Sequence, residues 1–333
     1  MIIVKSPTRV SFCGGGSDIP AFYRKHGGVV LSTGLSRYVY ISIHPYFYPD
    51  KIICKYSKSE LVDDSSQLQH PIFRVLLNKF GINGVEITST ADVPAGTGLG
   101  SSSSFTVTLI HALYAYTSKY VSPAQLAAEA CVTEIDLLHE PIGKQDQYAA
   151  AFGGLNVYRF RQDDQVDVEP VIMSGEAMSR LEHNLLMFYT GDLRSSSEIL
   201  EEQGRNVTTD SDLEQAQLKI CDLTNALHKE LINDNVGAIG PILHENWQLK
   251  RQLASGITTR YIDDAYEKAL AAGAVGGKLL GAGGGGFLLF YVPEHKHIAV
   301  KNALSDLMYM EFGFSRSGSA VIYVGDKPKR SVI

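Results

Sequence analysis

The feature that most constrains this chain is a glycine- and serine-rich segment, "PAGTGLGSSSS" (94–104), that runs directly into "FTVTLIHALYAY" (105–116). Apolar residues in the second stretch recur three and four positions apart, which is helical spacing. The serines therefore lie where a helix begins. The first backbone N–H groups there have no partner within the helix, and the helix dipole presents partial positive charge. A glycine-rich turn leading into such an end can close around an anion, most often phosphate.

Helix capping is the simpler explanation of these serines, because serine is among the best N-cap residues. One serine would be enough for a cap, whereas this segment has four serines behind three glycines. We therefore predict that the segment binds phosphate.

Two further glycine clusters lie near the ends of the chain. Five of the six residues in "GAGGGG" (281–286) are glycine, although a two-residue hairpin needs only one or two. This density favours backbone that closely approaches a ligand or the first glycine loop. In "SPTRVSFCGGGSDIP" (6–20), Arg9 and Asp18 lie on either side of a glycine triplet. The alternatives there are a surface charge pair and a loop that lines a ligand site.

The helical pattern over 123–139 places one carboxylate on an apolar face. In a regular helix, one stripe of residues would be solvated: Glu129, Thr133, Asp136 and Glu140. Glu134 instead falls in the opposite row, which is otherwise apolar: Ala127, Ala130, Cys131, Leu137 and Leu138. A buried carboxylate is unfavourable unless it is paired or binds a metal. A buried ion pair is the competing explanation, and the nearby phosphate loop favours Mg²⁺, which on a nucleotide takes one or two protein oxygens.

The segment "EPIGKQDQYAAAFGG" (140–154) contains a candidate catalytic group, Asp146, two residues after Lys144. An aspartate in such a place is commonly a turn residue or a helix N-cap. Beside a predicted phosphate site we favour a general base, which takes or orients a hydroxyl proton while a neighbouring cation keeps it ionised.

Length and composition indicate an ordinary globular enzyme. With 333 residues the chain is long enough for two domains, and strands and helices mixed without strict βαβ alternation predict an α+β fold. We place the boundary near residue 180, giving domains 1–180 and 181–333. A net charge of −6 without a long basic run argues against a dedicated nucleic-acid binder.

The sequence predicts a cytoplasmic protein that does not bind membranes. The first ten residues, "MIIVKSPTRV", lack the apolar region of a signal peptide, and no uncharged apolar span reaches 18 residues. The cysteines have no CxxC spacing and are expected to be small buried side chains in a reducing compartment: Cys13, Cys54, Cys131 and Cys221. A homodimer is an option that the sequence leaves open.

Taken in order, three motifs resemble those of the GHMP small-molecule kinase family, named for galactokinase, homoserine kinase, mevalonate kinase and phosphomevalonate kinase. "PTRVSFCGGGSD" (7–18), "PAGTGLGSSSS" and "KLLGAGGGGF" (278–287) are similar to the first, second and third motifs, and the resemblance covers essentially the full length. It implies a two-domain α+β fold, with an N-terminal domain like domain 2 of ribosomal protein S5 and a ferredoxin-like C-terminal domain. ATP would lie between them. The second motif lacks the lysine of a Walker A loop.

The resemblance also implies roles for individual residues. It makes ATP and Mg²⁺ the cofactors, and it places the triphosphate on one loop: Pro94, Gly96, Thr97, Gly98, Leu99, Gly100, Ser101, Ser102 and Ser103. Ser102 and Glu134 would hold Mg²⁺, Asp146 would be the base and Arg9 would support the reacting centre. The residues implied to face the sugar are Gly15, Gly16, Ser17, Asp18, Gly283 and Gly284.

Two departures from the family pattern affect the metal ligands. Ser103 and Ser104 stand where small residues such as alanine are frequent, so the identity of the metal-binding serine is open by one position. The interval from Glu134 to Asp146 is one residue longer than in members resembling mevalonate kinase, which weakens the assignment of Glu134.

Within the family, the first motif and residues 140–154 are most similar to members that phosphorylate the anomeric hydroxyl of a heptose 7-phosphate. L-fucose kinases are the nearest alternative. A non-catalytic protein that binds ATP and sugar is the alternative from another class, and the intact Arg9, Glu134 and Asp146 argue against it. A substrate that already carries phosphate needs a second anion site. The candidate is Arg194 within "YTGDLRSSSEIL" (189–200), with a solvated arginine beside a serine cap as the alternative.

Arg24 and Lys25 are rival contacts for the same phosphate, because they lie beside the loop that would face the sugar.

Overall fold

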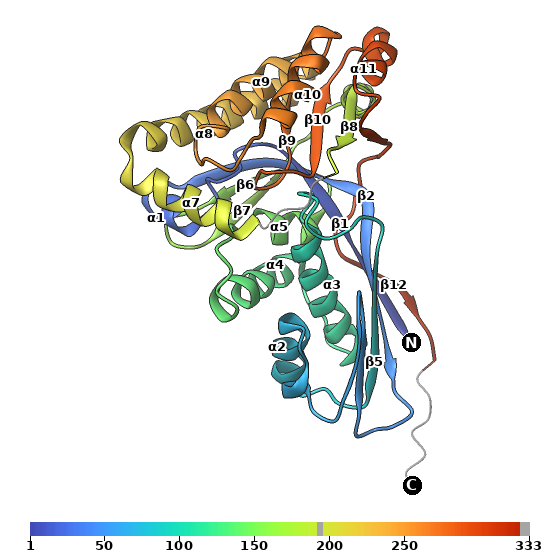
Figure 1. Cartoon of the computed structure of the whole chain (residues 1–333). Coiled ribbons are helices and arrows are strands. Elements are labelled where there is room, and N and C mark those ends of the chain that lie inside the picture. The colour runs from blue at the N-terminus through green and yellow to red at the C-terminus, as the bar shows by residue number, and fades with distance from the viewer. Residues whose placement is uncertain (192–195, 327–333) are drawn as a thin grey trace.

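The computed structural model describes residues 1–191 and 196–326, and of Ser196 only the backbone. Two β-sheets with their covering helices stack one above the other in Figure 1. The elements of the first half are β1 Ile2–Cys13, α1 Pro20–His26, β2 Gly28–Pro45, β3 Ile52–Lys55, β4 Ser59–Val62, η1 Ser65–Gln67, α2 Pro71–Phe80, β5 Val85–Ala91, α3 Ser101–Tyr116, α4 Pro123–Cys131, η2 Val132–Leu137, α5 Gln145–Phe152, β6 Leu155–Phe160, β7 Val166–Pro170 and α6 Gly175–His183.

The elements of the second half begin after α6. They are β8 Leu185–Tyr189, α7 Ser196–Thr209, α8 Ser211–Ile232, η3 Val236–Ala238, α9 Ile239–Lys250, α10 Arg260–Ala271, β9 Gly276–Leu279, β10 Phe287–Tyr291, η4 Glu294–Lys296, α11 His297–Ala303, β11 Met308–Met310 and β12 Ala320–Val324.

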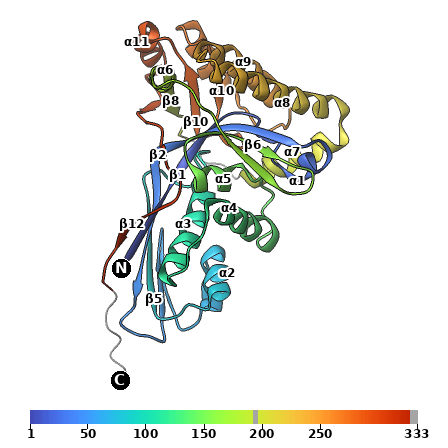
Figure 2. The ribbon, with the colours of Figure 1, turned by 180° about the vertical axis from the view of Figure 1, so that it is seen from behind.

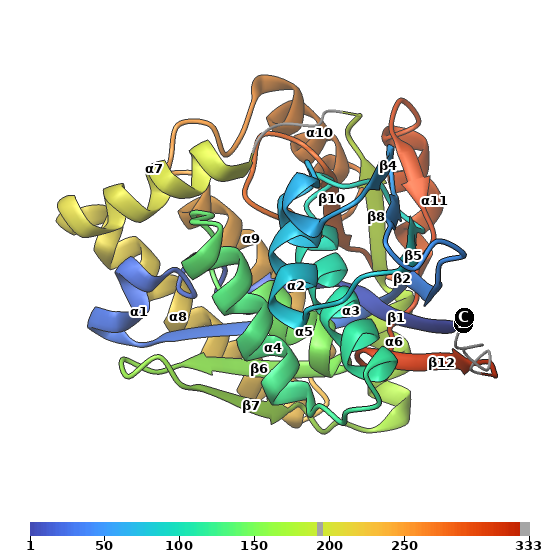
Figure 3. The same cartoon turned by 90° about the horizontal axis from the view of Figure 1, so that it is seen from below.

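The first sheet is built on two long antiparallel strands, β1 and β2. Its main order is β12-β1-β2-β5-β3-β4, and β6 joins β2 with β7 beyond it. One end of β2 (28–33) pairs with β6 and the other end (39–45) pairs with β5. The helices α2 to α5 lie together on one side of β1 and β2, as Figures 1 and 3 show. Buried apolar residues of these helices and strands form one continuous core, which fixes the start of α3 against β1.

The second sheet is antiparallel, in the order β11-β8-β10-β9, and packs against α8, α9 and α10. The last strand of the chain does not join it. Ala320 of β12 lies opposite Lys5 of β1, so β12 returns to the first sheet, and Figure 2 shows it running beside β1. The predicted boundary near residue 180 falls within α6, between the two sheets, and the division into domains stays a prediction.

The mixture of strands and helices agrees with the predicted α+β class, but one helix differs from its prediction. The helix expected over 123–139 is α-helical only to Cys131 and continues as a π-helix over η2. Because a π-turn adds a residue to a turn, the register of the helix faces shifts. Thr133, expected in the solvated stripe, is buried, whereas Leu137, expected in the apolar row, is 49% exposed.

Three of the four cysteines are buried, as predicted, and Cys221 is partly exposed. None of the four forms a disulfide. Within the described parts of the chain, no helix has the length and apolar character needed to cross a membrane.

Candidate active site

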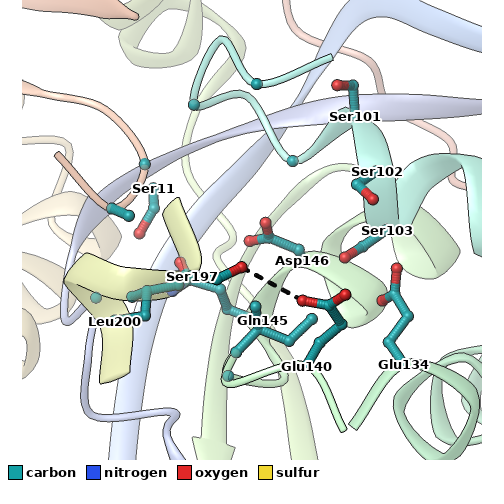
Figure 4. A pocket seen from close by; sticks show the side chains of 18 of the residues that line it. Ser11, Ser101, Ser102, Ser103, Glu134, Glu140, Gln145, Asp146, Ser197 and Leu200 are labelled. Atoms are coloured by element: carbon teal, nitrogen blue, oxygen red, sulfur yellow. Dashed lines mark hydrogen bonds between the residues drawn. The ribbon is translucent and has the colours of Figure 1, made fainter. Parts of the chain in front are cut away.

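The three glycine-rich segments meet around one cavity of about 500 Å³. It is lined by residues of β1 and the loop after it, the start of α2, the loop before α3, the first turn of α3, η2, the loop before α5, α5, α7, the end of α9, β9 and the loop after β9. In Figure 4, Asp146 lies near the middle, with the α3 serines and Glu134 on one side and Ser11 on the other. The cavity therefore has two ends with Asp146 between them.

The start of α3 forms an uncapped helix end at this cavity. Gly100, in the left-handed conformation with φ of 71°, is the N-cap, and no side chain of the described residues caps the first turn. Ser101 Oγ donates to Pro94 O at 3.4 Å, and Ser104 Oγ donates to Pro7 O at 2.8 Å. The capping explanation of the serines is therefore wrong, because no serine caps the helix. Backbone N–H groups without side-chain acceptors at a glycine turn fit an anion such as phosphate.

The loop before α3 packs closely against the third glycine segment. A Cβ on Gly98 would lie 2.6 Å from Leu280 O, and a Cβ on Gly281 would lie 2.5 Å from the Cα of Gly98. A Cβ on Gly286 would likewise collide with Thr97 O. The sequence left open whether residues 281–286 approach a ligand or the glycine loop before α3. In the structure, their backbone contacts that loop.

Not every residue implied for the ATP loop lines the cavity. Those that do are Gly96, Gly98, Gly100, Ser101, Ser102 and Ser103. Pro94, Thr97 and Leu99 are not among the lining residues, and the last two are buried. Thr97 Oγ1 donates to Pro94 O at 3.0 Å, while Leu99 O accepts from Arg9 N at 2.9 Å. These three residues therefore hold the loop through contacts within it and with the backbone of Arg9, and they do not face the cavity.

Arg9 of β1 and Asp146 of α5 form a bidentate ion pair. Arg9 Nε donates to Asp146 Oδ1 at 2.8 Å, and Arg9 Nη2 donates to Oδ2 at 2.9 Å. The remaining Nη1 donates to Gly98 O at 2.5 Å, which ties the pair to the glycine loop. The cation beside Asp146 is therefore Arg9, because Lys144 instead pairs with Asp164 at 3.1 Å.

Glu134 is buried, as predicted, and its carboxylate is held by neutral donors. Thr106 Oγ1 donates to Oε1 at 2.8 Å, and Gln147 Nε2 donates to Oε2 at 2.5 Å. Burial raises the pKa of Glu134 to about 7. Its carboxylate has no ion-pair partner in residues 1–191 and 196–326, which removes the ion-pair explanation.

The donor set around Glu134 fits a nucleotide-bound Mg²⁺. Figure 4 shows Ser103 pointing from α3 toward Glu134, with Ser102 next to it. The described residues contain no group of three or more His, Cys, Asp or Glu side chains that could hold a metal. A carboxylate and one serine hydroxyl suffice for Mg²⁺ when phosphate and water complete its octahedron.

Asp18 lies at the cavity wall together with Gly15 and Gly16. Its Oδ1 accepts from Gly16 N at 3.0 Å and from Gln145 Nε2 at 2.9 Å, and its Oδ2 accepts from Gln145 N at 3.1 Å. Burial is the main cause that raises the pKa of Asp18. The carboxylate therefore fastens the glycine triplet to the start of α5.

The other residues implied to face the sugar lie in different places. Ser17 is buried away from the cavity and exchanges hydrogen bonds with the backbone of Val29 at 3.0 Å. Gly283 lines the cavity, whereas Gly284 does not and donates its N–H to Ile257 O at 3.0 Å. Arg194 lies outside the described residues.

The start of α7 nevertheless reaches the cavity, where Ser197 donates to Glu140 at 3.3 Å (Figure 4). The rival phosphate contacts are already paired, Arg24 with Asp164 at 3.2 Å and Lys25 with Glu214. Neither of these two residues lines the cavity.

Two cavity lysines were missed by the sequence analysis. Lys278 is 2% exposed and Lys250 is 5% exposed. Burial lowers the pKa of Lys278 to about 8 and that of Lys250 well below its ordinary value. The sequence did contain a signal for Lys250, because it follows the buried Leu243 and Trp247 at helical spacing. The same kind of pattern, a charged residue on an apolar helix face, had singled out Glu134.

Both halves of the chain match known proteins. Residues 68–154 match the model for the GHMP kinases N-terminal domain, and residues 227–309 match the model for the GHMP kinases C-terminal region, about half of the chain together. The D-glycero-alpha-D-manno-heptose 7-phosphate kinase of Campylobacter jejuni is 28% identical over 95% of this chain and 97% of the relative.

Two further likenesses bear on the substrate. The bifunctional fucokinase/GDP-fucose pyrophosphorylase of Arabidopsis thaliana is 26% identical over 87% of this chain, but this match covers only 30% of that protein. The crystal structure of a D-glycero-D-manno-heptose 1-phosphate kinase from Bacteroides thetaiotaomicron has a TM-score of 0.80 and 26% identity, and it covers 98% of this chain and 100% of that one.

Proposed function

This chain belongs to the GHMP kinase family, and on that premise we propose that it transfers a phosphoryl group from ATP to the anomeric hydroxyl of D-glycero-α-D-manno-heptose 7-phosphate. It is an ATP-dependent sugar kinase, and the product of the proposed reaction is the 1,7-bisphosphate. The observation that carries the proposal is the bidentate Arg9–Asp146 pair, held against the glycine loop at the middle of the cavity.

The end of the cavity at α3 is the proposed site for the ATP phosphates. Enzymes that transfer phosphoryl groups act mostly by positioning the reactants and neutralising charge. Gly96, Gly98 and Gly100 all have positive φ, which lets the loop turn tightly along the cavity, and the N-terminus of α3 supplies N–H groups and a positive dipole. When bound, Mg²⁺ would neutralise triphosphate charge, held by Glu134 with either Ser102 or Ser103.

Asp146 is the proposed general base. Its carboxylate would accept the proton of the attacking hydroxyl as the new O–P bond forms and the bond from the γ-phosphorus to ADP breaks. Two hydrogen bonds from Arg9 orient this carboxylate. Because Arg9 also bonds the carbonyl of Gly98, the base and the phosphate loop are fixed relative to each other.

The choice of a heptose phosphate is supported by the relatives whose names concern heptose phosphates and which match nearly the whole chain. L-Fucose is the second candidate, supported by the likeness to the plant fucokinase. The proposal places the reaction in the cytoplasm.

ATP consumption measured with heptose 7-phosphate, L-fucose, D-mannose and D-galactose tests the choice. We expect the highest kcat/KM with heptose 7-phosphate. Faster turnover of free L-fucose would replace the heptose phosphate with the fucose alternative, and absence of ATP consumption with every sugar would contradict the proposed function.

A further inference from the structure

Two buried lysines, Lys250 at the end of α9 and Lys278 on β9, line the cavity. Lys278 Nζ donates to Phe12 O at 3.1 Å, and Lys250 Nζ donates to Gly281 O. Both side chains line the same cavity, and the charge of Lys278, after burial itself, lowers the pKa of Lys250. They thus form one cationic cluster.

Lys278 and Ser11 lie in the part of the cavity beside β1, whereas Lys250 is bonded to Gly281 in the loop after β9, which packs on Gly98. Phe12, whose carbonyl Lys278 contacts, is the neighbour of Ser11, and the hydroxyl of Ser11 is a buried cavity-lining group without a hydrogen-bond partner among the described residues. Figure 4 places Ser11 across Asp146 from the α3 serines and Glu134. An anion bound here would therefore be separated from the metal side of the cavity by the reacting centre.

The surrounding acidic groups do not balance these two charges. Asp146 is paired with Arg9. The charge of Asp18 acts on Lys250, but burial raises the pKa of Asp18, and the two side chains form no ion pair within residues 1–191 and 196–326. Burial raises the pKa of the Cys13 thiol, so this neighbour stays neutral. Neither lysine has an ion-pair partner within residues 1–191 and 196–326.

Each ammonium carries three donors, and one backbone carbonyl uses only one of them. Burial of an unpaired charge is unfavourable, and it lowers the pKa of both lysines. A bound phosphate dianion would favour their charged forms. The hydroxyl of Ser11, without a hydrogen-bond partner among the described residues, offers a further donor.

We propose that Lys250 and Lys278, with Ser11, bind the phosphate that the sugar substrate already carries. This inference rests on the proposed function and deepens it. The sugar spans the cavity, its anomeric hydroxyl at Asp146 and its phosphate at the cluster. The site lies within the described residues, and it differs from the candidate centred on Arg194.

The test compares the same heptose with and without its 7-phosphate, at saturating ATP, in the wild type and in Lys250→Met and Lys278→Met. We expect the ratio of kcat/KM for the phosphorylated sugar to kcat/KM for the free sugar to fall about 10- to 100-fold in each variant, as for a lost charge-assisted hydrogen bond. Lys219→Met is the matched control, because Lys219 on α8 is half exposed and pairs with Glu245. General damage to the fold would lower both values together and leave the ratio unchanged.

A second measurement keeps the inference separate from the proposed function. With Mg²⁺ and a non-hydrolysable ATP analogue filling the nucleotide end, inorganic phosphate should raise the Tm of the wild type but not that of either variant. If no sugar phosphate is turned over, the proposed function fails, and this measurement still decides whether the lysines bind phosphate. An unchanged substrate ratio, a rise in KM for ATP instead, or a wild-type Tm that does not respond to phosphate would overturn the inference.

Discussion

Arg9 and Asp146 are 137 positions apart in the chain, yet they form a bidentate ion pair at the last glycine of the phosphate loop. A Cβ on Gly100 would lie 3.0 Å from Asp146 Oδ2 and 3.2 Å from Arg9 Cγ. The carboxylate is therefore held between a fixed guanidinium and the loop that we propose receives ATP. This relationship makes the roles of the two residues testable one at a time.

Replacing Asp146 with asparagine should remove the base and keep the shape of the side chain. We expect kcat to fall about 10²- to 10⁴-fold, the usual contribution of a general base, while the affinity for ATP stays close to that of the wild type. Steady-state kinetics and calorimetric ATP titration measure the two effects. Asp63→Asn, at an exposed aspartate paired with Lys51, is the control. Near-normal turnover of Asp146→Asn would show that Asp146 is only structural.

The substitution Gly98→Val should abolish tight ATP binding. A side chain at this left-handed position, with φ of 82°, would collide with Leu280 O and displace the loop that lines the proposed phosphate site. We expect the Kd for ATP to rise at least about 10-fold by calorimetric titration. Gly175→Val is the control, because a Cβ at Gly175 meets nothing within 4 Å. A folded Gly98→Val protein with unchanged ATP affinity is incompatible with the proposed phosphate cradle.

Changing Glu134 to glutamine should weaken the apparent affinity for Mg²⁺. The amide keeps an oxygen for the hydrogen bond from Thr106 but carries no charge to attract the ion. Activity titrated against Mg²⁺ at saturating ATP should require a concentration about 10-fold higher. Glu129→Gln, on α4 and paired with Lys79, is the control. If the Mg²⁺ dependence of Glu134→Gln matches that of the wild type, Glu134 does not hold the metal.

Raising the pH through about 8 should reduce kcat/KM for the heptose phosphate. The pKa of Lys278 is lowered to about 8, and a lysine attracts phosphate only while it is protonated, that is, below its pKa. The groups that face it are the guanidinium of Arg9, the thiol of Cys13, whose pKa is raised by burial, and Lys250, whose own pKa is lowered. The kcat/KM profile reports groups of the free enzyme. The loss above pH 8 should be weaker in Lys278→Met, and an identical alkaline limb in both proteins would remove Lys278 as its cause.

The predictions that the structure confirmed came from local patterns in the sequence. The glycine and serine run before an apolar helical repeat located the start of α3, and helical spacing located the buried carboxylate of Glu134. These patterns work because a helix end and a helix face depend on residues only a few positions apart. The same reasoning failed after Cys131, where the π-helical segment shifted the faces and buried Thr133.

By itself, the sequence determined the α+β class, the helix end that can receive phosphate and the identity of the charged groups near it. Only the tertiary structure decided which of those charges meet: Arg9 rather than Lys144 lies against Asp146, and Lys250 and Lys278 line the same cavity. The tertiary structure also decided that β12 returns to β1 and that the glycine segment 281–286 packs on the loop before α3. The physical reason is that hydrogen bonds and charge pairs depend on distances of a few ångströms. The packing of the two sheets sets these distances, and residue spacing along the chain does not encode them.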